Sequence, residues 1–282
     1  MKYIVAVSGG VDSVVLLDML VRKNANTGDY LIVAHFDHGI RPESADDALF
    51  VERLAEKYGL SFETRREELG AGASEEKARE RRYAYLRAVA KKYDARIVTA
   101  HHLDDIVETI AINITRGTGW RGLAVLDSPD IERPLLDATK QDLIAYAKDK
   151  KLAWREDATN QDTTYLRNDI RQKLAGMDEQ TRSLLKLYRD RQVFLRKEID
   201  TEARRLLGAS PYRRYVFILT PRDSAIELLR AVFVQECGYA PTRPQLDRTL
   251  LAIKTMQPGK YHRVMNDVGL RFTRTYFVVE HL

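Results

Sequence analysis

The chain alternates short apolar runs with longer segments whose apolar residues recur at helical spacing. Tyr3–Val7 is long enough only for a short strand, and the apolar residues of 14–20 then follow at the spacing of a helix. The same alternation predicts strands at 31–35, 60–64 and 96–100, and helices at 45–58, 74–93 and 104–114. This order favours an α/β fold, with a Rossmann-like parallel sheet and helices on both of its faces.

The pattern changes after about residue 137. It then predicts helices at 139–150, 178–207, 225–236 and 243–256, and a hairpin of 261–265 with 270–279 around Asn266–Gly269. A chain of 282 residues also exceeds the usual size of a single core. We therefore expect two domains, a nucleotide-binding domain at 1–177 and a smaller, mostly helical domain at 178–282.

Composition narrows the class of protein. The chain is 44% hydrophobic and 31% charged, which is ordinary for a globular protein. No apolar run approaches membrane-spanning length, and the N-terminus lacks a signal-peptide pattern. The single cysteine, Cys237, excludes an internal disulfide and a C-x-x-C motif. These features favour a cytoplasmic enzyme without a membrane partner.

Charge is unevenly distributed along the chain. Residues 1–180 carry 27 lysines and arginines against 31 acidic residues, whereas 181–282 carry 19 against 10. A basic region attached to a nucleotide-binding domain indicates a nucleic-acid partner. A solvated helix face explains the same charges equally well, so both interpretations stay open.

The segment Ser8-Gly9-Gly10-Val11-Asp12-Ser13 lies between the first strand and the first helix. This placement turns backbone N–H groups and the positive end of a helix toward an anion. We expect Gly9 and Gly10 to be required because a Cβ would block close approach of the backbone and positive φ. The loop lacks the lysine of a G-x-x-x-x-G-K loop. It resembles instead the PP loop of enzymes that cut ATP between its α and β phosphates.

Two further polar clusters follow predicted strands, His35–Arg41 and His101–Glu108. The carboxyl ends of parallel strands meet at one edge of a sheet, where ligands bind, so all three clusters should gather there. Asp105 and Glu108 are three residues apart at the start of a helix and therefore share a face. Two carboxylates on one face suit an ammonium group.

Several segments extend the resemblance beyond the loop. They are His35–Ser44, Glu76–Tyr83, Thr99–Thr109, Arg116–Leu123, Arg133–Leu136 and Asp157–Arg171. With the loop, this ordered set resembles the tRNA(Ile)-lysidine synthetases, closely over 1–175 and loosely beyond. The chain departs from the family pattern at Ile106, where Gln is expected, and at Ala124-Val125, where Ala-Gly is expected. We expect a short form of the family, without the extra C-terminal domain of longer members.

The resemblance implies a PP-loop ATPase fold and a ligation reaction. ATP adenylates the oxygen on C2 of the wobble cytidine in a tRNA(Ile) with a CAU anticodon. Free L-lysine then displaces AMP to give lysidine, which changes codon specificity from AUG to AUA. ATP and Mg²⁺ are the implied cofactors, tRNA and lysine the implied partners, and a homodimer is expected because family members are often dimers.

The resemblance also implies roles for individual residues. ATP or pyrophosphate is expected at Ser8, Gly9, Gly10, Val11, Asp12, Ser13 and His35. Lysine is expected at Asp105 and Glu108, with Asp12, His102, Asp105 and Glu108 as catalytic residues and Asp12 as a Mg²⁺ ligand. RNA or substrate contacts are expected at Arg79, Arg116, Asn160, Arg167, Asn168 and Arg171. Arg79 can equally well pair with Glu75 or Glu76 on its own helix.

Three other functions remain open at this point. The histidines and aspartates of the two clusters can be read as the ligands of a metal-dependent phosphohydrolase. A tRNA thiolase uses a similar loop but usually needs a reactive cysteine or an iron–sulfur cluster, whereas Cys237 lies far along the chain from every motif. An RNA-binding protein without catalytic activity explains the basic C-terminal third but not the loop.

Overall fold

The computed structural model describes residues 1–39, 44–70, 74–155 and 166–281. It divides into two compact units, Met1–Gln192 and Val193–Leu282. The expected boundary at 177/178 precedes this division, because helix α7 (Glu179–Leu207) begins against the first unit. Arg189 of α7 is only 7% exposed and donates to the carbonyls of Val125 and Leu126, at 2.8 and 2.9 Å.

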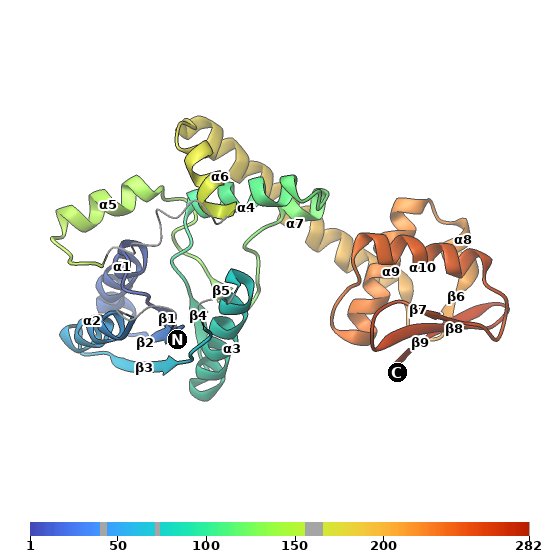
Figure 1. Ribbon diagram of the computed structural model, residues 1–282, viewed down its shortest axis with the longest axis horizontal. Coiled ribbons are helices and arrows are strands. Elements are labelled where there is room, and N and C mark those ends of the chain that lie inside the picture. The colour runs from blue at the N-terminus through green and yellow to red at the C-terminus, as the bar shows by residue number, and fades with distance from the viewer. Residues whose placement is uncertain (40–43, 71–73, 156–165, 282) are drawn as a thin grey trace. The chain divides into compact units, whose positions relative to one another are not determined.

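The first unit contains a parallel five-stranded sheet with the order β3-β2-β1-β4-β5 (Figure 1). Its strands are β1 (Lys2–Ala6), β2 (Tyr30–Asp37), β3 (Ser61–Arg66), β4 (Arg96–Val98) and β5 (Ile131–Glu132). The sequence pattern predicts the first four strands and misses β5, which is too short to show a period. Because β1 lies between β2 and β4, the segments that follow these three strands meet at one edge.

Helices cover both faces of this sheet. The helices of the first unit are α1 (Val11–Thr27), α2 (Ser44–Lys57), α3 (Glu75–Tyr93), α4 (Leu103–Thr115), α5 (Lys140–Asp149) and α6 (Leu166–Leu174), with the short 3₁₀ helix η1 (Trp120–Leu123). Val5 packs with α1, α2 and α5, whereas its neighbour Ile4 packs with α3 on the opposite face. The expected α/β fold is confirmed.

The second unit combines helices with an antiparallel sheet. Its helices are the end of α7, α8 (Arg214–Leu219), α9 (Arg222–Cys237) and α10 (Arg243–Thr255). Its strands, in the order β6-β9-β8-β7, are β6 (Tyr212–Arg213), β7 (Tyr261–Arg263), β8 (Val268–Phe272) and β9 (Tyr276–His281). Phe217 and Phe233 of the helices share one core with Phe272 and Phe277 of the strands.

The helical character of this region is confirmed, but the expected strand at 270–279 is wrong. It is broken by a turn in which Thr273 and Tyr276 bond to each other. The Tyr276 amide donates to Thr273 Oγ at 2.9 Å, and the Thr273 amide donates to the Tyr276 carbonyl at 2.8 Å. A threonine hydroxyl makes this turn without glycine or proline, which removes the usual sequence signal.

None of the helices in the described ranges combines the length and the apolar character that a membrane crossing requires.

Candidate active site

The three polar clusters meet at the carboxyl edge of the first unit's sheet. The loop Ser8–Ser13 follows β1, His35 and His38 lie at the end of β2, and His101–Glu108 follows β4. Nε2 of His102 lies 3.8 Å from Asp12 Oδ2, so the start of α4 and the loop are in close contact. The clusters that follow β1, β2 and β4 therefore lie at one edge of the sheet, as the sequence predicts.

Ser8–Ser13 forms a tight turn into α1. Ser13 Oγ accepts from the Ser8 amide at 3.2 Å and donates to the Gly10 carbonyl at 2.9 Å. Gly9 has φ +92°, and a Cβ there would come within 3.4 Å of Phe50. Gly10 has φ −71°, and a Cβ there would meet only Ser8 Oγ, at an ordinary contact distance of 3.7 Å. The need for positive φ therefore holds for Gly9 and is wrong for Gly10, where only the approach of a ligand can require glycine.

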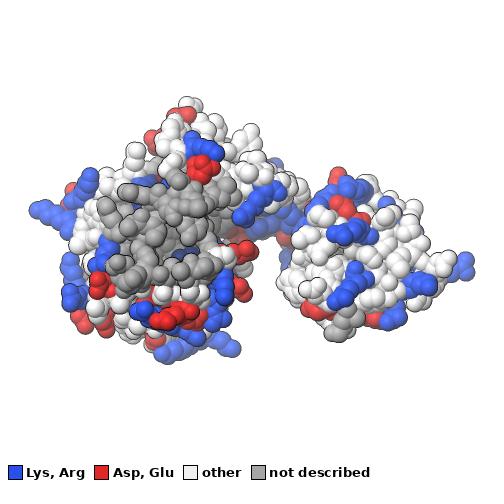
Figure 2. Space-filling model, in the orientation of Figure 1, with Lys and Arg blue, Asp and Glu red and all other residues white. Residues whose placement is uncertain are grey.

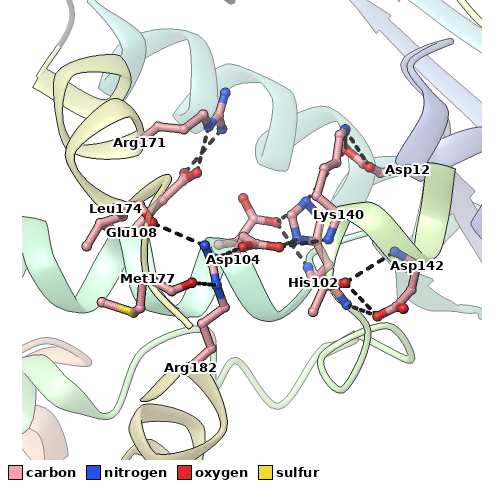
Figure 3. Close-up of polar contacts among 12 residues, drawn as sticks. Asp12, His102, Asp104, Glu108, Lys140, Asp142, Arg171, Leu174, Met177 and Arg182 are labelled. Atoms are coloured by element: carbon pink, nitrogen blue, oxygen red, sulfur yellow. Dashed lines mark hydrogen bonds and ion pairs between the residues drawn. The ribbon is translucent and has the colours of Figure 1, made fainter. Parts of the chain in front are cut away.

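Asp12, in the first turn of α1, is paired with a lysine from α5. Lys140 Nζ donates to both carboxylate oxygens of Asp12, at 2.7 and 2.8 Å (Figure 3). The Lys140 amide in turn donates to Asp104 Oδ2 at 2.7 Å, which ties α5 to α4. Asp12 thus belongs to a network of charges that joins three helices.

His102 caps α4 from a buried position. Its amide donates to Asp105 Oδ2 at 3.0 Å, and its ring Nε2 lies 3.6 Å from the same oxygen. Its Nδ1 lies 3.5 Å from Asp104 Oδ2. The single atom Nε2 thus faces the carboxylates of both Asp12 and Asp105, which brings the loop and α4 together.

The predicted carboxylate pair is bound by two predicted arginines. Arg167 donates to Asp105 Oδ1 and to Glu108 Oε2, both at 2.9 Å. Arg171 donates to both oxygens of Glu108, at 2.6 and 3.2 Å (Figure 3). This bidentate contact raises the pKa of Arg171 above its usual value. Four residues from α4 and α6 thus form one compact cluster.

Asp105 remains a carboxylate despite its burial. Burial by itself would raise its pKa, but His102, His101 and Arg167 outweigh that effect and hold the pKa below its usual value. Burial has the opposite consequence for His101, whose pKa it lowers so that the ring is neutral near pH 7. The site therefore combines a stable anion with a neutral imidazole.

Other predicted residues lie elsewhere or outside the described part. His35 is buried, and its Nδ1 bonds to the Val7 carbonyl at 2.9 Å, so this ring supports the sheet edge. The Arg79 guanidinium lies 4.9 Å from the centre of the Tyr83 ring. Arg116 is exposed at the end of α4. Asn160, Arg41 and the side chain of Asn168 lie outside the described residues.

Sequence reasoning missed Lys140, Asp104 and Arg182. Arg182 of α7 bonds to Asp104 Oδ1 and to the carbonyls of Leu174 and Met177 (Figure 3). Asp104 lies inside the segment Thr99–Thr109, but the spacing that predicts a shared helix face selects only Asp105 and Glu108. Lys140 follows β5 and begins α5, and without β5 nothing in the sequence places it beside the loop.

The basic C-terminal third is only partly available to a partner. Arg182 and Arg189 bond within the first unit, and buried Arg214 donates to the carbonyls of Ile253, Met256 and Thr273 in the second. On the face of the second unit seen in Figure 2, the lysine and arginine side chains are spread out rather than gathered in one patch. A nucleic-acid partner and a solvated helix face therefore both still account for this charge.

Comparison with known proteins identifies the family of the first unit. The family model described as the PP-loop domain matches residues 1–177. The chain belongs to the PP-loop family. Membership implies that the protein uses ATP. We refer to Ser8–Ser13, the loop between β1 and α1, as the PP loop.

The curated relatives share one name. The tRNA(Ile)-lysidine synthase of Thermus thermophilus is 45% identical over 176 residues, which are 60% of this chain and 34% of the relative. Those of Thermosipho africanus and Azoarcus sp. are each 33% identical, over 88% and 93% of this chain and 61% and 62% of their own lengths. The chain thus spans between a third and two thirds of the relatives it matches.

A solved structure supports the fold of this PP-loop protein. The U34-tRNA thiolase NcsA of Methanococcus maripaludis matches with a TM-score of 0.57 and 19% identity, over 68% of this chain and 72% of that one. At this identity the likeness extends to the fold alone.

Proposed function

We propose that this chain ligates lysine to C2 of the wobble cytidine of a tRNA(Ile) with a CAU anticodon, forming lysidine, AMP and pyrophosphate. One observation carries the proposal. The carboxylates of Asp12 in the PP loop and of Asp105 in α4 both approach one nitrogen, Nε2 of His102, at 3.8 and 3.6 Å. A site for an activated nucleotide and a site for an amine are thus adjacent. The names of the relatives support the same substrates.

The first step activates a poor leaving group. The cytidine oxygen on C2 attacks the α-phosphorus of ATP, the bond to the β-phosphate breaks, and pyrophosphate leaves. The Ser8 hydroxyl and the backbone N–H groups at the start of α1 are suited to hold that anion, while Ser13, whose hydroxyl donates to the Gly10 carbonyl, fixes the turn. The oxygen on C2 then carries the AMP group, so that it can depart as part of AMP in the second step.

The second step uses the carboxylates of α4. The lysine Nε attacks C2, the bond from C2 to the AMP oxygen breaks, and the amine loses protons. Neutralising a lysine ammonium at pH ~7.4 costs about 4 kcal/mol, because its pKa is about 10.4. We infer that Asp105 binds the ammonium and accepts its proton only as attack proceeds. Each carboxylate oxygen has two lone pairs, so Asp105 can take an ammonium while it keeps Arg167.

Arginines of α6 complete the site. Arg167 and Arg171 fix the carboxylates of Asp105 and Glu108 in place. Their positive charge beside the PP loop also suits the phosphate of the adenylated base or the RNA backbone. Arg79, Arg116, Asn160 and Asn168 are proposed RNA or substrate contacts on the resemblance alone.

Asp12 fits Mg²⁺ in part. A carboxylate oxygen is a suitable ligand for this hard cation, but both oxygens of Asp12 are bonded to Lys140. In the described ranges, no three His, Cys, Asp or Glu side chains are grouped as a metal site. Asp12 would therefore supply a single protein ligand, and Mg²⁺ would neutralise charge on the phosphates of ATP.

The remaining proposals concern the effect of lysidine on decoding, and the location and oligomeric state of the enzyme. Lysidine at the wobble position would change the codon read by the tRNA from AUG to AUA. We propose that the chain works in the cytoplasm, where its tRNA is, and as a homodimer, as family members often do.

Incorporation of labelled lysine tests the reaction. The protein is incubated with ATP, Mg²⁺, radiolabelled lysine and a tRNA(Ile) transcript with the CAU anticodon. We expect label in the tRNA that survives deacylation, and none in a matched transcript whose wobble cytidine is replaced by uridine. Label that disappears on deacylation, or that enters both transcripts equally, contradicts the proposal.

A further inference from the structure

The PP loop presents a charge problem for binding ATP. It contains no lysine, and its one charged side chain is that of Asp12. A carboxylate in the first turn of α1 repels the phosphate oxygens that a helix N-terminus otherwise attracts. By itself the loop offers backbone N–H groups and hydroxyls but no cation.

Lys140 brings a cation to this place from 128 residues further along the chain. Its Nζ donates to both oxygens of Asp12, at 2.7 and 2.8 Å. An ammonium group has three N–H donors, so one donor is left after Asp12 has taken two. The Lys140 side chain is 43% exposed, which leaves that donor accessible from outside the protein.

The backbone of Lys140 is held firmly. Lys140 is the first residue of α5, whose N-terminus is closed by a capping box in which Thr139 and Asp142 bond to each other. The Lys140 amide donates to Asp104 Oδ2 at 2.7 Å, and Arg182 bonds to the other oxygen of Asp104. The side chain therefore starts from a fixed point and reaches the loop in a defined direction (Figure 3).

The surroundings indicate a site for a ligand rather than a surface ion pair. Lys140 reaches the first turn of α1 at the carboxyl edge of the sheet, where a parallel sheet binds its ligands. His102, which is 6% exposed, lies beside the pair, with its Nε2 3.8 Å from Asp12 Oδ2 and its Nδ1 3.5 Å from Asp104 Oδ2. The Lys140–Asp12 pair therefore lies at the place in the fold where ATP is proposed to bind.

We propose that Lys140 is the phosphate-binding lysine of this PP loop. It donates its third N–H to an oxygen of the β- or γ-phosphate of ATP while it keeps Asp12 neutral, and it holds pyrophosphate in the same way. A lysine at the start of α5 thereby replaces the lysine that other ATP loops carry within the loop. The inference deepens the proposed function and rests on it for the placing of ATP on this loop.

Calorimetric titration of ATP, pyrophosphate and AMP tests the inference without tRNA or lysine. We expect Lys140→Met to weaken ATP and pyrophosphate binding by about tenfold or more, the effect of losing one charge-assisted hydrogen bond. AMP, which lacks the β- and γ-phosphates, should bind almost unchanged. Lys140→Arg should restore most of the affinity. Lys148→Met, an exposed lysine near the other end of α5, is the matched control and should bind all three ligands normally.

A second variant separates a phosphate contact from simple neutralisation of Asp12. If Lys140 contacts phosphate, Asp12→Asn combined with Lys140→Met binds ATP more weakly than Asp12→Asn alone, because the contact is lost whatever the charge at position 12. If Lys140 only cancels the charge of Asp12, the double variant regains the affinity of Asp12→Asn, and the inference is overturned. The double variant leaves no unpaired carboxylate at this position, so it is expected to fold even if Lys140→Met does not. Its ATP affinity, compared with that of Asp12→Asn, then provides the test.

Two other results would overturn the inference: unchanged ATP affinity in Lys140→Met, or an equal loss for ATP and AMP. Lysine incorporation, measured in parallel, judges the proposed function separately. A chain that binds ATP through Lys140 and modifies no tRNA would refute that function and leave the inference standing.

Discussion

At the scale of single residues, the two glycines of the PP loop make different demands. Gly9 needs a positive φ of 92°, whereas Gly10 has an ordinary φ of −71° and room for a Cβ, which would lie 3.7 Å from Ser8 Oγ. Gly9→Ala should lower the free energy of unfolding by about 1–3 kcal/mol, the usual cost of such backbone strain. Gly10→Ala should leave stability nearly unchanged and weaken ATP binding, because the methyl group keeps phosphate away from the backbone.

Urea unfolding and ATP titration of the two variants check this contrast. Equal stability of the two variants would mean that the turn tolerates a side chain at Gly9. Normal ATP binding by Gly10→Ala would mean that the nucleotide does not approach the backbone at this point.

Asp105 is the residue on which the second chemical step depends. Asp105→Asn removes the proton acceptor, so lysine transfer from a previously adenylated tRNA should slow by about a hundredfold or more. Formation of the adenylated tRNA should change much less. Asp130→Asn, a half-exposed carboxylate of the same unit that pairs with Arg87, is the control and should transfer lysine normally. Full transfer activity in Asp105→Asn would remove this carboxylate from the mechanism.

The side chains of the site were predictable where a motif follows a clear strand. The PP loop after β1 and the carboxylates after β4 are of this kind, and their partners Arg167 and Arg171 came from the resemblance. Lys140 and Arg182 were not predictable, because their positions depend on the two-residue strand β5 and on the packing of α7. Such contacts arise between segments far apart in the chain and leave no local pattern.

At the scale of elements, Asp18 joins three helices on one face of the sheet. It is 2% exposed on α1, accepts from Tyr58 after α2 and from Tyr146 of α5, both at 2.8 Å, and pairs with Arg22 at 2.7 Å. Asp18→Asn leaves one phenol without an acceptor, so the free energy of unfolding at pH 7 should fall by about 1–3 kcal/mol.

The effect of Asp18→Asn should depend on pH. Burial alone would raise the pKa of Asp18, but the hydrogen bonds from Arg22, Tyr58 and Tyr146 outweigh it and lower the pKa below 3.8. The carboxylate therefore stabilises the fold above that pH and loses its effect as the pH falls through the lowered pKa. Urea unfolding of both proteins across this range should show the difference shrinking with acid. A constant or growing difference would contradict this account.

Helices and buried strands were predictable because their periods extend over many residues. Helix α6 was not predictable, because its segment is polar and shows no apolar face at helical spacing. Its role is evident only in the structure, where its arginines Arg167 and Arg171 bind Glu108. The turn after β8 was hidden for a similar reason, because Thr273 performs the task usually marked by glycine. Weak local signals, rather than conflicting ones, account for these misses.

At the scale of the whole molecule, the single cysteine separates ligation from sulfur chemistry. Cys237 ends α9 in the second unit, and burial raises the pKa of its thiol, which lowers the supply of reactive thiolate. Cys237→Ser should therefore leave lysine incorporation within about twofold of the unmodified protein. Loss of activity with unchanged thermal stability would revive the thiolase interpretation.

The presence of two units was predictable from the sequence, but the position of the boundary between them was not. The change of pattern near residue 137 and the basic C-terminal third indicate a second domain. The boundary lies within α7, because buried Arg189 anchors the start of this helix to the first unit. A continuous helix carries no sequence mark at the point where its packing partner changes.

Transfer of label from ATP to tRNA tests the central claim most directly. The protein is incubated with tRNA(Ile) and ATP labelled at the α-phosphorus, first without lysine and then with it. The account predicts that label enters the tRNA as bound AMP, with one pyrophosphate released for each, and that lysine then releases it as free AMP. Formation of ADP and phosphate, or release of pyrophosphate without any label on the tRNA, would contradict the account.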